Sequence, residues 1–137
     1  MHIAAHSNSK IEDLLGQELI LSSEDIQNSR IKITSILNAK KAPLLVTLSA
    51  CNTASSFYSS EKHLSLKDAF FIAGARTVIG ALSRVSDLST AIFMKQFYRQ
   101  AKQDRVEKAF HQAKHYIRER YPHPSYWASM VISGDYR

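Results

Sequence analysis

The chain has one cysteine, Cys51, and six histidines, and a thiol beside an imidazole can do nucleophilic chemistry. The thiolate is the reactive form, and an imidazole produces it by accepting the thiol proton. Cys51 closely follows the apolar run at residues 44–48, and His6 follows a short strand-like segment at residues 2–5. Because parallel neighbouring strands end at the same edge of a sheet, these two side chains could meet there. A lone cysteine is more often a small buried residue, so the pair is a hypothesis at this point.

The remaining histidines give little indication of a metal site. His111 and His115 are spaced to share one helix face, as metal ligands often do. They lack an acidic or cysteine partner at a familiar spacing, which favours a surface or packing role. His63 lies in a segment rich in serine and threonine that reads as a loop. We therefore expect no metal ion and no cofactor.

The elements that must position Cys51 and His6 alternate between strands and helices, a pattern typical of an α/β sheet. Residues 44–48 and 77–82 are continuous apolar runs, as expected for strands covered on both faces. A further strand is expected at residues 126–132, and a weak extended segment at residues 18–21. A serine-capped helix is expected from residue 22, and residues 30–42 are ambiguous, with a helix ending before Pro43 as one reading.

Three longer helices are expected in the second half of the chain. Ser65-Leu66-Lys67-Asp68 has the spacing of a capping box, and Gly74 is placed to end the helix that follows. Asp87 is expected to cap a long helix with this apolar stripe: Leu88, Ala91, Ile92, Met94, Phe97, Tyr98 and Ala101. The next helix is expected to turn these residues inward: Val106, Ala109, Phe110, Ala113 and Ile117.

Size and composition indicate a single ordinary domain spanning residues 1–137. The hydrophobic fraction is 45% and the formal charge is +6, with lysines and arginines spread along the chain. Such a charge can attract nucleic acid, but no nucleic-acid-binding motif accompanies it, so a solvated helix surface is favoured. No apolar run approaches the ~18 residues of a membrane span, and the first residues are too polar for a signal peptide. We expect a cytoplasmic protein that binds neither membrane nor nucleic acid.

Four segments carry a family likeness through their order along the chain. They are Met1-His2-Ile3-Ala4-Ala5-His6-Ser7, Leu48-Ser49-Ala50-Cys51-Asn52-Thr53, Ala73-Gly74-Ala75-Arg76-Thr77-Val78-Ile79-Gly80 and His123-Pro124-Ser125-Tyr126-Trp127-Ala128. Together they resemble the CHAT family, a caspase-related domain often attached to tetratricopeptide repeats. The resemblance covers nearly the whole chain.

The resemblance implies a caspase-like, three-layer α-β-α sandwich with a mostly parallel sheet, and a cysteine endopeptidase acting on protein or peptide substrates. In such enzymes the histidine precedes the cysteine by ~50 residues, and here His6 precedes Cys51 by 45. His6 then matches the catalytic histidine and Cys51 the nucleophile. The backbone N–H groups of Ser7 and Cys51 would stabilise the oxyanion. Ser83 and Asp87 fall in the region that contributes to the substrate groove.

A complete caspase-like domain has strands before the histidine strand, and this chain begins almost at that strand. We therefore expect an N-terminally truncated domain whose sheet is completed by a missing N-terminal segment or by a protein partner. Serine at position 7, where the family usually has glycine, also keeps a second reading open. In that reading the chain is a catalytically silent, CHAT-type interaction module.

Overall fold

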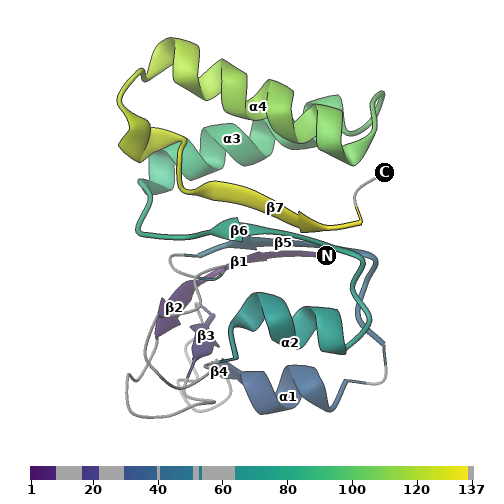
Figure 1. The fold of residues 1–137 in the computed structure, drawn as a ribbon. Helices are drawn as coiled ribbons and strands as arrows, with labels where there is room; N and C mark the ends of the chain where they lie inside the picture. Colours follow the sequence, from purple (N-terminus) through teal and green to yellow (C-terminus); the bar gives the residue numbers. More distant parts are fainter. Residues whose placement is uncertain (9–16, 22–29, 40, 51–52, 54–63, 136–137) are drawn as a thin grey trace.

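The structure is a computed structural model that describes residues 1–8, 17–21, 30–39, 41–50, 53 and 64–135. Its main sheet has four strands, and two layers of helices enclose it (Figure 1). The spatial order of the strands is β1 (His2–Ala4), β5 (Leu45–Ser49), β6 (Thr77–Ala81) and β7 (Met130–Gly134). β1, β5 and β6 are parallel, and β7 runs antiparallel to β6. The predicted mostly parallel sheet is confirmed.

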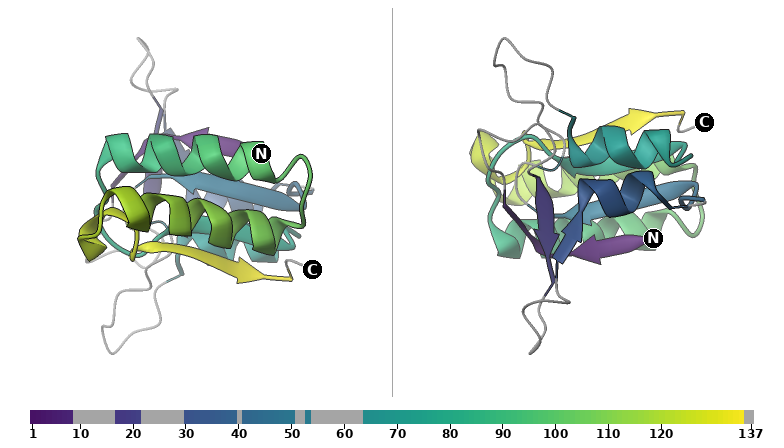
Figure 2. Two further views of the ribbon diagram at one scale, coloured as in Figure 1. Left: turned by 90° about the horizontal axis from the view of Figure 1, so that it is seen from above. Right: turned by 90° about the horizontal axis from the view of Figure 1, so that it is seen from below.

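Helices cover both faces of this sheet. The pair α3 (Asp87–Gln100) and α4 (Val106–Arg120) packs on one face, and α1 (Ile33–Leu37) and α2 (Leu66–Ile72) pack on the other (Figure 1). The view from above in Figure 2 shows α3 and α4 lying side by side over the sheet, with their axes running along the strands. The arrangement is the predicted α-β-α sandwich. No helix in the described ranges is long and apolar enough to cross a membrane.

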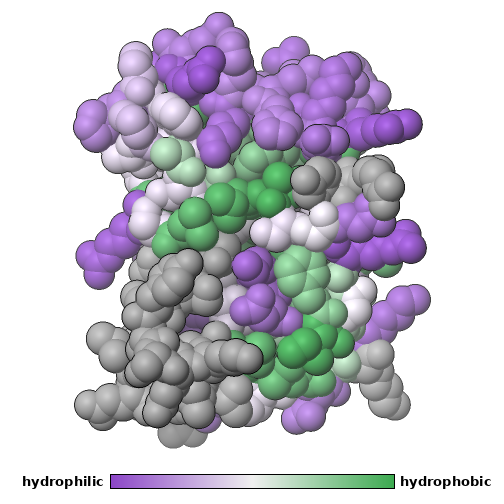
Figure 3. Space-filling view, viewed as in Figure 1, coloured by the Kyte–Doolittle hydropathy of each residue, from purple (hydrophilic) through white to green (hydrophobic). Residues whose placement is uncertain are grey.

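The hydrophobic core has two parts, one on each side of the sheet. Successive residues of a strand point to opposite faces, so Val78 packs against the α1–α2 layer and Ile79 against the α3–α4 layer. All five residues of β6 are buried, as the apolar run predicted. In Figure 3 the α3–α4 layer is mostly hydrophilic on its outer surface, and a hydrophobic band lies at the level of β7. The basic side chains of α4 are thus largely part of a solvated surface.

A second, antiparallel sheet lies beyond the end of β1. It consists of β2 (His6–Asn8), β3 (Glu18–Ile20) and β4 (Arg30–Lys32), with β3 in the middle. Only Ala5 separates β1 from β2, so one short stretch of chain joins the two sheets. An ion pair between Arg30 and Glu18 links β4 to β3.

The sequence left residues 30–42 ambiguous. They begin as the strand β4 and continue as the helix α1. The helix predicted to begin at residue 22 lies outside the described residues.

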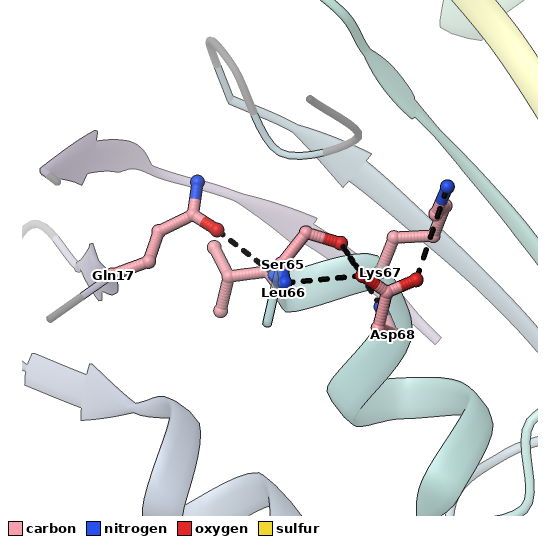
Figure 4. Close-up of polar contacts among 5 residues, drawn as sticks. All are labelled: Gln17, Ser65, Leu66, Lys67 and Asp68. Atoms are coloured by element: carbon pink, nitrogen blue, oxygen red, sulfur yellow. Dashed lines mark hydrogen bonds and ion pairs between the residues drawn. The ribbon is translucent and has the colours of Figure 1, made fainter. Parts of the chain in front are cut away.

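The start of α2 confirms the predicted capping box (Figure 4). The Asp68 N–H donates to Ser65 Oγ at 3.2 Å, and the Ser65 N–H donates to Asp68 Oδ2 at 3.1 Å. The Leu66 N–H donates to the side-chain oxygen of Gln17 at 2.9 Å, so a residue distant in sequence satisfies another free donor of the first turn. At the other end of α2, Gly74 has a φ of +99°, as expected for a glycine that ends a helix.

Two predicted details of α3 are wrong. Ser86 is the N-cap residue and makes no side-chain capping bond, and Asp87 is the first helical residue. The face turned to the sheet is formed by Ser89, Thr90, Phe93, Met94 and Phe97. Leu88, predicted to be buried, is 63% exposed. Apolar residues occur on more than one side of this helix, so packing against the sheet selects the buried face.

The last strand also begins later than predicted. Residues 124–126 form a 3-10 turn, η1 (Pro124–Tyr126), in which the Ser125 N–H donates to Nδ1 of His123 at 3.3 Å. Proline at the first position of the turn is preorganised for a helical start. The strand begins only at Met130, which lies opposite Ala81 of β6. The buried face of α4, by contrast, is as predicted at Ala109, Phe110, Ala113 and Ile117.

Candidate active site

The candidate site lies at the carboxyl ends of β1 and β5. These strands are adjacent and parallel, and Ala4 lies opposite Ser49. His6 follows Ala4 by two positions, and Cys51 follows Ser49 by two positions. Cys51 lies outside the described residues. In sequence, His6 and Cys51 therefore each come two positions after neighbouring, paired strand residues. These strands end at the edge of the sheet where α/β proteins usually form their binding and active sites.

Two adjoining depressions open at this edge. The first has a volume of about 280 Å³ and is lined by Ala5, His6, Ser7, Ser49, Ala50, Arg84, Val85, Asp87 and Thr90. The second has a volume of about 360 Å³ and is lined by His2, Ala4, Ala5, His6, Ile20, Ser49, Asp87, Thr90, Ala91 and Met94. They share His6, Asp87 and Thr90 among others, so they form two parts of one cleft between the strand ends and the N-terminus of α3.

His6 is the first residue of β2, is exposed to solvent and lines both parts of the cleft. Ser7, the predicted oxyanion donor, lies within β2 opposite Leu19 and lines the first part. An extended strand backbone suits serine as well as glycine. Ala50, the residue before Cys51, is buried and lines the same part. The structure thus brings together His6, Ser7 and the chain segment that leads directly to Cys51.

Of the two predicted groove residues, only Asp87 lines the cleft. It stands at the first position of α3, beside Arg84 and Val85 in the first part. Ser83 is exposed, lines neither part, and its hydroxyl contacts that of Ser129. Asp135, by contrast, lies at the opposite end of the sheet, where its carbonyl accepts from the Thr77 hydroxyl at 2.6 Å.

Sequence reasoning missed Thr90, which lies one turn after Asp87 on α3 and lines both parts of the cleft. Its side-chain oxygen is buried and has no hydrogen-bond partner among the described residues. The usual acceptor for a helical threonine is the carbonyl four residues earlier, on Ser86. That carbonyl already accepts the Thr90 N–H and the Ser89 hydroxyl, each at 2.9 Å. The spacing Asp87-x-x-Thr90 was the available sequence signal, because residues three apart share a helix face.

His2 lines the second part and makes polar contacts with β5 and α3. Its Nδ1 lies 2.8 Å from the Thr47 hydroxyl and 3.1 Å from the Tyr98 hydroxyl, and its Nε2 lies 3.3 Å from the Ser49 hydroxyl. Burial, and then the positive charge of the Met1 amine, lower the pKa of His2 below its ordinary value of 6.5. The neutral ring is therefore favoured near neutral pH, in keeping with a packing role.

The described residues contain no group of three or more histidine, cysteine, aspartate or glutamate side chains that could hold a metal ion. His111 and His115 lie on the exposed side of α4. Nδ1 of His115 lies 3.6 Å from a carboxylate oxygen of Glu119, one turn along the same helix. This pair belongs to the solvated helix surface.

A comparison of the chain with models of known protein families agrees with the order of its sequence motifs and with its fold. The family model of the CHAT domain matches residues 1–135, essentially the full length of the chain. Among curated proteins, none matches the sequence. A family match of this extent identifies the fold and its relationship: the chain belongs to the CHAT domain family, whose members are caspase-like.

Proposed function

We propose that the protein is a cysteine endopeptidase that hydrolyses peptide bonds through a His6–Cys51 dyad. One observation carries the proposal: His6 and Ala50, the residue before Cys51, line a single depression at the carboxyl ends of adjacent parallel strands. Membership of a caspase-like family supports the same chemistry. A thiol and an imidazole at one sheet edge are the two groups that acyl transfer to cysteine requires.

The proposed reaction proceeds in two halves. His6 accepts the thiol proton, and the Cys51 thiolate attacks the carbonyl carbon of the scissile bond. The N–H groups of Ser7 and Cys51 stabilise the oxyanion of the tetrahedral intermediate. The C–N bond then breaks, and His6 gives its proton to the leaving amine. In the second half His6 takes a proton from water, which attacks the thioester, and the peptide acid leaves as Cys51 regains its proton.

Asp87 is the proposed contact for a basic substrate side chain. Its carboxylate stands at the cleft, so it attracts lysine or arginine near the scissile bond. Arg84 lines the same part and holds a competing positive charge, which limits the size of this preference. Ser83 does not line either part of the cleft, and its contribution to the substrate groove stays a prediction.

A protein partner is the proposed activator. Among the described strands, β1 is paired with β5 on one side only, and its other edge carries main-chain donors and acceptors. A strand from a partner, or from a segment preceding this one, would complete the sheet beside His6. Ordering the strand that leads to His6 would couple binding to catalysis.

A second candidate function is that of a catalytically silent interaction module. One observation favours it: among the described residues, none forms a hydrogen bond with the His6 ring. In efficient enzymes with such a dyad, a third group usually orients the imidazole. Reactivity of the thiol separates the two functions, because an interaction module needs no activated thiolate.

The test is the rate of Cys51 alkylation by a peptidyl electrophile, compared with alkylation of a free thiol. Wild type, Cys51→Ala and His6→Ala are compared, with circular dichroism to verify folding. An active dyad predicts rapid labelling of the wild type at neutral pH, none in Cys51→Ala and slow labelling in folded His6→Ala. Labelling of the folded wild type no faster than a free thiol would refute a dyad that is active in this chain alone, and would leave the interaction module or a dyad that requires its partner strand.

A further inference from the structure

Lys114 of α4 holds the chain at the start of β7 through backbone carbonyls. Its ammonium group donates to the Met130 carbonyl at 3.0 Å and to the Ala128 carbonyl at 3.4 Å. It also lies 5.8 Å from the ring centroids of Phe110 and Trp127, within the range of a cation–π contact. Hydrogen bonds from a charged donor are stronger than neutral ones, so this half-buried side chain fixes residues 128–130, the β7 entry segment.

The β7 entry segment is bonded on another side to the loop that follows β6. The Leu82 N–H donates to the Ser129 carbonyl at 2.9 Å, and the Ser83 hydroxyl contacts the Ser129 hydroxyl. Leu82 directly follows Ala81, which ends β6 and lies opposite Met130 in the sheet. In Figure 1 the loop from β6 to α3 and the start of β7 lie at the same end of the sheet. The entry segment thus connects α4 to this loop.

The same loop forms a wall of the cleft. Arg84 and Val85 come directly after Ser83 and line the first part, and Asp87 then opens α3. Ser83 lines neither part, and its hydroxyl contact is with the β7 entry segment. The position of the wall therefore depends on a segment that Lys114 holds.

We propose that Lys114 is a positioning residue for the substrate cleft, which holds the wall of Arg84 and Val85 in place through the β7 entry segment. The proposal rests on the proposed function, because the cleft is that of the proposed endopeptidase. Lys114 lines neither part of the cleft, so it acts through the loop and not by touching substrate. A displacement of about 1 Å in groups that position a substrate can cost about a hundredfold in rate.

Methionine at position 114 is the test substitution. Lys114→Met removes the ammonium group and keeps an unbranched stem against the aromatic rings. Lys108→Met is the matched control, because Lys108 is on the same helix, is 62% exposed and pairs with Asp104 at 2.6 Å. It removes the same charge without touching the β7 entry segment. Methionine and glutamine are both good helix formers, so Lys114→Gln takes the place of Lys114→Met if that variant does not fold.

The first measurement is hydrogen exchange of the Leu82 amide by NMR, relative to the Val78 amide within β6. Exchange at Leu82 reports local opening of the loop, whereas a general loss of stability accelerates both amides. Bonds from a charged donor are strong enough that we expect the Leu82-to-Val78 ratio to rise about tenfold in Lys114→Met. It should stay within about twofold of the wild type in Lys108→Met. Equal acceleration of both amides, or of neither, in Lys114→Met would overturn the proposal.

The second measurement is the ratio of alkylation rates with a peptidyl electrophile and with iodoacetamide. Both reagents react with the same thiol, so the ratio isolates recognition of the peptide by the cleft. We expect the ratio to fall at least about threefold in Lys114→Met and to stay within about twofold of the wild type in Lys108→Met. An unchanged ratio in folded Lys114→Met would overturn the positioning role and leave the dyad intact.

Failure of the proposed function would give a different result. If the wild-type thiol reacts with both reagents like a free cysteine, a dyad that is active in this chain alone is refuted. Exchange at Leu82 does not involve the thiol, so it still decides whether Lys114 holds the loop. A faster Leu82 exchange in Lys114→Met would support that link, and an unchanged exchange would overturn it.

Discussion

Ala4 of β1 and Ser49 of β5 lie opposite each other in a parallel strand pair, and each precedes a chemically reactive residue by two positions. His6 and Cys51 therefore stand the same number of positions beyond the last paired residues of their strands. Because the pairing is parallel, both strands end at one edge. An antiparallel pairing of the same strands would send the two residues to opposite edges of the sheet.

Asp87→Asn should reduce the preference for basic residues beside the scissile bond. An exposed ion pair contributes up to about 1 kcal/mol, so the ratio of labelling by arginyl over uncharged peptidyl electrophiles should fall about two- to fivefold. Asp135→Asn is the matched control, because Asp135 lies at the opposite end of the sheet. Equal ratios in wild type and Asp87→Asn would remove Asp87 from substrate recognition.

His2 should make the folded state sensitive to mild acid. Its pKa is lowered by folding, so the unfolded chain binds more protons between the two pKa values. The stability is present above the ordinary value of 6.5 and is lost as the pH falls through the lower, folded-state pKa. Thermal unfolding of wild type and His2→Gln between pH 8 and pH 5 measures the effect. The wild type should lose more stability than the variant; parallel curves would contradict the shift.

Thr90→Val should stabilise the fold. The Thr90 hydroxyl is buried without a hydrogen-bond partner among the described residues, and such a group costs about 1–3 kcal/mol. Valine has the same shape, so we expect a gain of about 1 kcal/mol in the free energy of unfolding, measured with urea. Thr90→Ser keeps the hydroxyl and should show no gain. Loss of stability in Thr90→Val would reveal a partner for the hydroxyl.

Two glycines with similar backbone conformations should respond differently to alanine. Gly74 has a φ of +99° with no atom within 4 Å of an added Cβ, so Gly74→Ala should cost about 1 kcal/mol from backbone strain alone. At Gly134, with a φ of +102°, the Cβ would lie 2.1 Å from the Arg76 carbonyl oxygen. Gly134→Ala must displace the end of β7 and should cost about 3 kcal/mol or more. Equal losses in urea unfolding would contradict the close approach.

Local sequence was sufficient for much of the fold. The capping box at Ser65, the apolar runs of β5 and β6, and the inward face of α4 each depend on residues within a few positions of one another. Such signals are set by side-chain spacing and backbone preference, and they were predicted correctly. The order of the motifs also identified the family, and with it the two residues of the proposed dyad.

Tertiary structure alone decided which surfaces and polar groups meet. The antiparallel sheet β2–β3–β4, the buried face of α3 and the late start of β7 depended on packing between distant segments. The same is true of Thr53, whose hydroxyl meets Ala81, a residue 28 positions further along the chain. The periodic spacing of apolar residues carries information only about residues that are close together in the sequence. The partner of a buried hydroxyl is chosen by the strand order of the sheet, because burial leaves each polar group only the donors and acceptors that packing brings within reach.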